Sequence, residues 1–292
     1  MMAELLALLL ALAACLSVAP LGTLNGLAAV GARALVREAV PYGAHERHKL
    51  DIYTPASAAP AGGWPLVVFF YGGSWNSGAR ADYAFVGRAL AARGVLTLVA
   101  DYRLYPEVRY PDFLHDCARA LAWGLDEAAR LGANPRRVFV MGHSAGAYNA
   151  AMLALDPRWL AGTGHVRGEL AGWVGLAGPY DFFPTANPDA QPVFFHPHYP
   201  AQAQPIDWVS AQAPASFVAA PVADKLVSPT RSTQGLATKL RAAGVPVTLQ
   251  LYERASHMTI VGALAWPLAF VAPVLDDVVA FVDAVPPASA AH

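Results

Sequence analysis

The pattern GHSAG at residues 142–146 places Ser144 where a nucleophilic serine would be presented. The apolar run 138–141 is typical of a buried strand, and the segment 148–155 is typical of a helix. A strand, a tight turn and a helix are the context in which G-x-S-x-G exposes its serine. The two glycines are needed because side chains there would collide across so tight a turn. The pattern therefore predicts Ser144 as a nucleophile, against the alternative of a Gly-Ser turn that opens an ordinary helix.

A serine nucleophile needs a histidine base and a carboxylate that orients this base. His257 follows the strand-like segment 247–252 and a short polar loop, so it would lie beyond the carboxyl end of a late strand. This position fits the chain order of serine, acid and histidine that is typical of the strand-turn-helix context. The other downstream histidines are less well placed, near the nucleophile helix, in a proline-rich loop or at the C-terminus: His165, His196, His198 and His292.

Two aspartates compete for the role of the acid. Asp224 ends the apolar run 216–223, and the interval from Asp224 to His257 holds one predicted helix and one predicted strand. Such an interval brings both loops to the same edge of a parallel sheet. Asp181 also follows an apolar run, and its alternative role is a turn aspartate that bonds its own backbone. We favour Asp224 as the acid and keep Asp181 as its rival.

A glycine pair follows another clear strand, at residues 65–70. Glycines after a strand let the backbone turn its N–H groups outward, which is the chemistry of an oxyanion hole. The expected donors are the backbone N–H groups of Gly73 and Ser74, together with that of Ala145 from the GHSAG turn. A plain Gly-Gly turn is the alternative for this pair.

The motifs YGGSW at 71–75, DYRLYPE at 101–107 and GHSAG at 142–146, followed by the Asp224 and His257 segments, resemble the α/β-hydrolase fold. Within this fold the chain is similar to carboxylesterases related to hormone-sensitive lipase and to bacterial feruloyl and acetylxylan esterase-like domains. The resemblance implies an α/β fold with an eight-stranded, mostly parallel sheet, flanking helices and no large lid domain. It also implies a serine carboxylesterase that hydrolyses small to medium esters through an acyl-enzyme, without metal or cofactor.

The chain departs from this family at two places. The family usually has His-Gly-Gly where this chain has residues 71–73, beginning with Tyr71; because the donors are backbone groups, the oxyanion hole should survive. The family usually has His-Gly shortly before the acid, where this chain has Ala220-Pro221, and a proline there can displace the loop that carries Asp224. We interpret Asp101 and Arg103 of the DYRL motif as structural.

Apolar runs alternate with amphipathic segments along the chain, which predicts a mostly parallel sheet with helices on both faces. Candidate strands end near Tyr53, Phe70, Ala100, Met141, Ala177, Ala220 and Tyr252, and candidate helices cover about 82–93, 112–131, 145–155, 230–243 and 268–284. The segment 178–214 is rich in proline and aromatic residues, and we interpret it as a wall or small cap over the acyl pocket, packed on the core. It is too short for a full lid, which favours modest soluble esters over long triglycerides.

Length and charge fit one α/β domain over residues 32–292, preceded by an apolar segment over 1–31. The formal net charge of −1 gives no electrostatic footprint for nucleic acid. The expected partner is a small-molecule ester, and the sequence leaves the oligomeric state open. His196-Pro197-His198 has the spacing of two metal ligands, but no cysteine or carboxylate flanks it closely, so we predict no metal site.

The N-terminal segment resembles a bacterial lipoprotein signal, because the apolar run 5–14 ends at Cys15. Residues 1–4 lack the Lys or Arg that a secretory signal carries. Proline, glycine and asparagine within 20–25 interrupt the run before it is long enough to span a membrane. We expect a cell-envelope protein, periplasmic or anchored to the outer membrane, and keep a membrane-associated segment or a cytoplasmic protein as alternatives. The only other cysteine, Cys117, lies on a predicted helix and is expected to be an inert thiol.

Two other functions remain open at this point. An amidase of the same fold, similar to arylformamidases, would share the glycine pair and the GHSAG turn. A non-catalytic envelope protein would keep the fold as a binding module, although such a module has no physical need for a serine, an acid and a histidine in this order.

Overall fold

The computed structural model describes residues 20–288 of the 292-residue chain. Its centre is an eight-stranded sheet in the order β1-β2-β4-β3-β5-β6-β7-β8. The strands are β1 Leu35–Pro41, β2 Lys49–Thr54, β3 Trp64–Phe70, β4 Leu96–Ala100, β5 Ala133–His143, β6 Leu170–Leu176, β7 Ala215–Pro221 and β8 Val247–Tyr252. The pairs β1–β2 and β2–β4 are antiparallel, and the remaining pairs are parallel. The prediction of an α/β fold with a mostly parallel sheet is confirmed.

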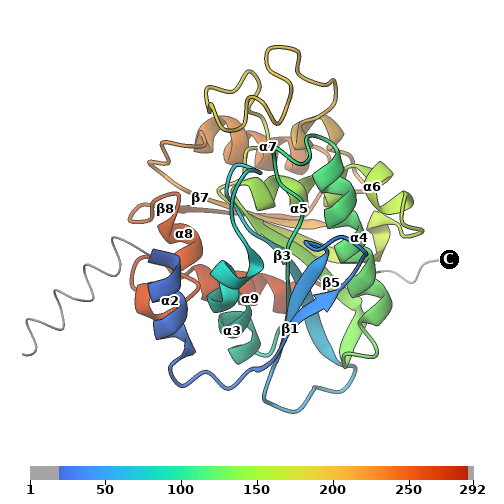
Figure 1. The fold of residues 1–292 in the computed structure, drawn as a ribbon, viewed down its shortest axis with the longest axis vertical. Helices are drawn as coiled ribbons and strands as arrows, with labels where there is room; N and C mark the ends of the chain where they lie inside the picture. The colour runs from blue at the N-terminus through green and yellow to red at the C-terminus, as the bar shows by residue number, and fades with distance from the viewer. Residues whose placement is uncertain (1–19, 289–292) are drawn as a thin grey trace, which may run out of the picture.

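Helices cover both faces of this sheet (Figure 1). The α-helices are α2 Pro20–Ala29, α3 Ala84–Ala92, α4 Asp112–Glu127, α5 Ala145–Leu155, α6 Pro157–Ala161, α7 Gly235–Ala242, α8 Thr259–Gly262 and α9 Val274–Ala284, and the shorter turns are η1 Arg80–Tyr83, η2 Arg167–Glu169, η3 Pro205–Trp208, the π-helical η4 Pro229–Gln234 and η5 Trp266–Leu268. Helices α3 and α9 contact each other on one face, and α4, α5 and α6 contact one another on the other. Every residue of β4 and β6 is buried between these layers, which explains their continuous apolar sequences.

The predicted strand ends lie within two residues of the ends of β2 to β8. The pattern did not predict β1, because most of its side chains are exposed. This strand lies at the sheet edge and pairs only with β2, with an irregularity between Arg37 and Val40. An edge strand that is held by backbone hydrogen bonds leaves little trace in the apolar pattern.

Part of the apolar segment predicted over 1–31 lies on the folded body. Residues 20–29 form α2, in which Leu24 is buried and Asn25 donates to two carbonyl groups of η1. Residues 1–19 of the segment, with Cys15, lie outside the described part of the chain. Among residues 20–288, no helix is both long and apolar enough to cross a membrane.

The connection between β6 and β7 lies over the carboxyl ends of the strands, where it is drawn in yellow at the top of Figure 1. Its one helical turn is η3, and it carries several buried side chains, such as Tyr180 and Phe194. Phe194 packs against Trp75 and Tyr148, with ring centroids 4.8 and 5.5 Å apart. The connection is therefore a packed wall at the edge of the sheet where α/β proteins place their ligands.

Candidate active site

A sharp turn presents Ser144 between β5 and α5. Ser144 has φ 53° and ψ −121°, a backbone conformation that is strained for any residue except glycine. The flanking glycines make this turn possible: a Cβ on Gly142 would lie 2.1 Å from the carbonyl oxygen of Gly146, and one on Gly146 would lie 2.0 Å from that of Phe70. The structure therefore leaves no room for a side chain at either glycine, as the sequence predicts.

Replacement of Gly146 by alanine is expected to lower the free energy of unfolding by about 3 kcal/mol or more, because the added methyl group meets fixed backbone of the central sheet. Thermal and urea unfolding measure this change. Gly26→Ala in α2 is the matched control, since a Cβ there has nothing within 4 Å, and it should leave stability unchanged or raise it by up to about 1 kcal/mol. Equal stability of Gly146→Ala and wild type would contradict the steric account.

The structure brings the three residues of the predicted relay together. His257 Nε2 lies 2.8 Å from Ser144 Oγ, and His257 Nδ1 lies 2.7 Å from Asp224 Oδ2. His257 lies in the loop between β8 and α8, and Asp224 lies in the loop after β7. Both loops meet Ser144 at the carboxyl edge of the sheet. The imidazole can thus accept the serine proton at Nε2 while the carboxylate holds Nδ1–H.

The Asp224 side chain is shielded from solvent, although the residue lies in a partly exposed loop. Burial alone would raise the pKa of this carboxyl, but hydrogen bonds from His257 and from the N–H groups of Leu226 and Val227 hold it below its ordinary value. The loop reaches His257 with Pro221 as the last residue of β7, so the proline does not displace the acid. Asp224 therefore stays ionised at neutral pH.

The structure does not bring the rival acid, Asp181, to the histidine. Its Oδ1 accepts a hydrogen bond of 2.7 Å from Arg231 on η4. Asp181 lines the same cavity as Ser144 but is not recorded as a partner of His257. Asp181 is thus an ion-paired residue of the cavity wall.

The glycine loop lies beside the serine. A Cβ on Gly72 would lie 2.9 Å from Ser144 Cβ, so the strand end packs directly against the nucleophile. The next three residues all have positive φ, 125° at Gly73, 48° at Ser74 and 59° at Trp75. Of the predicted oxyanion donors, Ser74 and Ala145 line the cavity that holds Ser144. Gly73 precedes Ser74 in the chain and is not part of the cavity lining.

Side chains on both sides hold this loop in place. Trp75 Nε1 donates to Asn149 Oδ1 on α5 over 2.9 Å. Tyr71, at the position where the family resemblance leads us to expect histidine, is buried and donates to Asp101 Oδ1 over 2.9 Å. Arg103 pairs with Asp116 on α4. Asp101 and Arg103 thus make structural contacts, and an aromatic residue anchors the loop in place of the histidine.

His143 is a buried residue of the site for which the sequence predicts no role. Its Nε2 lies 2.7 Å from the backbone carbonyl oxygen of His257. Because a carbonyl only accepts, Nε2 carries the hydrogen, and Nδ1 is left without a partner among the described residues. His143 therefore holds the backbone that carries the base. Its place inside GHSAG, next to the nucleophile, was the one sequence feature that pointed to it.

The protein should lose stability as pH falls below 6.5, because of His143. Burial, with the nearby charge of His257, lowers the pKa of His143 from its ordinary value of 6.5 to about 3. Between these values the unfolded chain binds a proton that the folded protein does not, so stability that is present above pH 6.5 is lost as pH falls. This one group should lower the free energy of unfolding by about 2 kcal/mol between pH 7 and pH 5.

The variant His143→Gln tests this linkage, because glutamine keeps an N–H donor but does not titrate. Urea unfolding of both proteins at pH 7 and pH 5 should show a smaller decrease in the variant. The same decrease in both proteins would mean that His143 does not carry the effect.

The cavity beside Ser144 has a volume of about 340 Å³. It is bounded by the glycine loop, by the loop after β7 and by the β6–β7 connection. Its wall combines apolar and polar groups, among them Phe182, Thr185, Asn187, Leu226 and Arg231. A cavity of this size lies at the small end of the range for ligand pockets in proteins. It fits the sequence-based interpretation of residues 178–214 as a wall over the acyl pocket.

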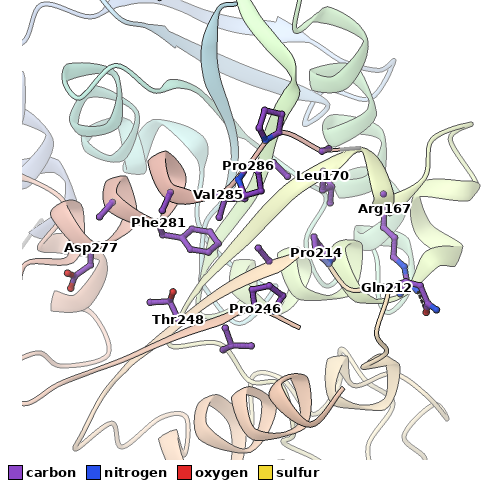
Figure 2. A pocket seen from close by; sticks show the side chains of 18 of the residues that line it. Arg167, Leu170, Gln212, Pro214, Pro246, Thr248, Asp277, Phe281, Val285 and Pro286 are labelled. Carbon is purple, nitrogen blue, oxygen red and sulfur yellow. Dashed lines mark hydrogen bonds between the residues drawn. The ribbon is translucent and has the colours of Figure 1, made fainter. Parts of the chain in front are cut away.

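A second, larger hollow of about 760 Å³ lies beside α9, at the amino ends of β6, β7 and β8. Figure 2 shows the side chains that line it. Its polar lining includes Arg167, Gln212, Thr248 and Asp277, and among residues 20–288 none that lines it is serine, cysteine or histidine. Ser144 follows the carboxyl end of β5, at the opposite edge of the sheet. The described lining of the larger hollow therefore offers no serine or cysteine nucleophile with a histidine base.

Three of the other histidines from the sequence analysis lie away from the site, and the fourth, His292, is outside the described residues. His196 and His198 are exposed, and His165 pairs with Glu169. Within the described ranges, no three His, Cys, Asp or Glu side chains are grouped so that they could hold a metal ion. Cys117 is buried and free, and burial raises the pKa of its thiol well above the ordinary value. These residues contribute no further catalytic group.

Comparison with curated proteins finds esterases. The chain is 30% identical over 225 residues to esterase LipC of Mycobacterium tuberculosis. This match covers 70% of this chain and 55% of LipC. It is 31% identical over 156 residues to the probable isoprenylcysteine alpha-carbonyl methylesterase ICMEL2 of Arabidopsis thaliana, which covers 51% of this chain and 36% of that protein. The chain thus spans about a third of the length of this plant protein and of a second methylesterase from the same plant.

Solved structures show the same fold at low sequence identity. A truncated carbohydrate esterase from gut microbiota has a TM-score of 0.70 and 18% identity, covering 86% of this chain and 96% of the other. Esterase 2 of Thermogutta terrifontis with bound butyrate has a TM-score of 0.67 and 22% identity, covering 86% and 92%. Residues 50–240, more than half of this chain, match the BD-FAE family. The chain therefore belongs to the BD-FAE family of α/β-hydrolase esterases.

Proposed function

We propose that this protein is a serine carboxylesterase that hydrolyses small to medium carboxylic esters through an acyl-enzyme. The observation that carries the proposal is the hydrogen-bonded chain from Ser144 through His257 to Asp224, with distances of 2.8 and 2.7 Å. A serine, a histidine and a carboxylate that are hydrogen-bonded in this order are needed for acyl transfer and serve no purpose in passive binding. The esterase names of the relatives support the same class of reaction.

The chemistry follows from the geometry. Ser144 Oγ attacks the ester carbonyl while His257 Nε2 takes its proton, and the same nitrogen then returns the proton to the leaving alcohol. Asp224 keeps Nδ1 protonated and stabilises the imidazolium that forms. The backbone N–H groups of Gly73, Ser74 and Ala145 stabilise the oxyanion. Water then repeats the sequence on the acyl-enzyme and releases the acid.

The cavity volume supports short acyl groups. A space of about 340 Å³ with polar groups on its wall accommodates a small ester and excludes the chains of a triglyceride. Butyrate, which is bound to the Thermogutta esterase, is a short-chain acid. We expect the highest kcat/KM for p-nitrophenyl esters of two to about six acyl carbons, with a steep decrease for longer chains.

A chain-length series of p-nitrophenyl esters, measured with the full chain in detergent, tests this function. An N-formyl aromatic amide is run beside it, because an amidase of the same fold remains the alternative. Hydrolysis of the short esters supports the proposal, whereas turnover of the formamide alone would show that the protein is an amidase. Absence of turnover, together with no labelling by a fluorophosphonate probe, would identify a binding module.

A further inference from the structure

One side chain of the oxyanion loop has a hydroxyl group that the backbone mechanism does not use. Ser74 follows the glycine pair, and its Oγ accepts a hydrogen bond of 3.1 Å from Asn187 Nδ2. Both residues line the cavity that holds Ser144 and His257. We propose that the Ser74 hydroxyl donates a further hydrogen bond to the oxyanion, and that Asn187 orients it. The inference rests on the proposed esterase function.

The orientation of Asn187 follows from its other contact. Its Oδ1 accepts from the backbone N–H of Asp189 over 3.0 Å, so the amide nitrogen must face Ser74. An amide nitrogen only donates, and Ser74 Oγ is therefore the acceptor of this bond. The hydroxyl hydrogen of Ser74 stays available, because among residues 20–288 no bond that it donates is recorded. Its position on the cavity wall gives it access to a bound substrate.

Both partners are fixed before a substrate arrives. The carbonyl of Asn187 accepts from the N–H groups of Ala190 and Gln191, and its own N–H donates to Thr185 Oγ1, so the asparagine sits in an ordered turn. On the other side, the carbonyl of Trp75 accepts from Tyr105 N–H, next to the strained φ of 48° at Ser74. A donor held in this way needs no reorganisation as charge develops on the carbonyl oxygen.

The alternative is that Asn187 only ties the β6–β7 connection to the glycine loop. The two roles differ in what they stabilise. A tie stabilises the folded loop in all states of the reaction, whereas a donor to the oxyanion acts in the transition state and should affect kcat with little change in KM. Kinetic constants can therefore separate them.

The variants Ser74→Ala and Ser74→Gly remove the hydroxyl but keep the backbone N–H of residue 74. Each is expected to lower kcat for p-nitrophenyl acetate by about 10²-fold and to change KM by less than about threefold. Affinity for a small alkylboronic acid, whose adduct with Ser144 is tetrahedral, should fall together with kcat. Ser77→Ala is the matched control, because Ser77 is in the same loop and its hydroxyl only donates to the carbonyl of Gly73.

The variant Asn187→Ala completes a double-mutant cycle with Ser74→Ala. We expect a decrease in kcat of about tenfold for Asn187→Ala alone and no further decrease in the Ser74→Ala background, since the asparagine acts through the hydroxyl. A kcat within threefold of wild type for both Ser74 variants would overturn the proposal, and so would independent, multiplying effects in the cycle. Circular dichroism and thermal unfolding confirm that each variant is folded.

Failure of the esterase function itself gives a different result. A folded wild-type protein that neither hydrolyses the esters nor reacts with a fluorophosphonate would overturn both proposals together. A wild-type esterase whose Ser74 variants keep full activity overturns only the role of the hydroxyl.

Discussion

Replacement of Ser144 by alanine is expected to lower kcat for p-nitrophenyl acetate by about 10⁴-fold or more. The loss is large because Ser144 Oγ is the atom that forms the covalent bond. It lies 2.8 Å from His257 Nε2, and among residues 20–288 no other hydroxyl group is hydrogen-bonded to this imidazole. The variant should fold normally, since it loses only one partly exposed hydroxyl group and alanine keeps the Cβ. Steady-state kinetics and mass spectrometry after fluorophosphonate treatment measure both consequences.

The control for this variant is Ser228→Ala in the same cavity. Ser228 Oγ accepts from Arg231 N–H at the start of η4, so its loss should cost about 1 kcal/mol of stability and less than a tenfold decrease in kcat. Fluorophosphonate should modify the peptide that contains Ser144 in wild type and in Ser228→Ala, and no peptide in Ser144→Ala. Retention of a tenth of the activity in Ser144→Ala would assign the nucleophile to another residue.

The central elements of the fold could be predicted from the sequence because local patterns determine them. Strands β3 to β7 lie between two helical layers, so they read as apolar runs, and the GHSAG turn carries its own steric requirement for glycine. Elements at the periphery lack this pattern. Strand β1 is exposed along most of its length, and α2 was hidden in an apolar segment whose composition resembles a signal.

The residues of the proposed relay could be predicted for a similar reason. Asp224 and His257 each follow a strand of a parallel sheet, so the order of the strands places them at one edge. The contacts that support them could not be predicted in this way. His143 meets the carbonyl of His257, and Asn187 meets Ser74, across segments whose proximity depends on how irregular loops pack. No spacing in the sequence encodes such a distance.

The sequence leaves two aspartates as candidates for the acid. Removal of the charge at each of them should lower kcat by amounts that differ by orders of magnitude. Asp224→Asn is expected to lower kcat by about 10³ to 10⁴-fold. In the wild type, Asp224 Oδ2 lies 2.7 Å from His257 Nδ1. An uncharged amide in this place neither stabilises the imidazolium nor keeps the hydrogen on Nδ1. The decrease should be smaller at high pH, where a stronger external base can take the proton from Ser144. A pH profile of kcat/KM for both proteins measures this difference.

Asp181→Asn is the matched variant, since it removes one carboxylate from the same cavity wall. Its ion pair with Arg231 is partly exposed, with 28% and 44% of the two side chains accessible, so the loss should change stability by less than about 1 kcal/mol and kcat by less than tenfold. The opposite result, a larger loss for Asp181→Asn than for Asp224→Asn, would show that the loop after β7 moves in solution and that the acid comes from the β6–β7 connection. The two variants together therefore decide which loop supplies the charge that the histidine needs.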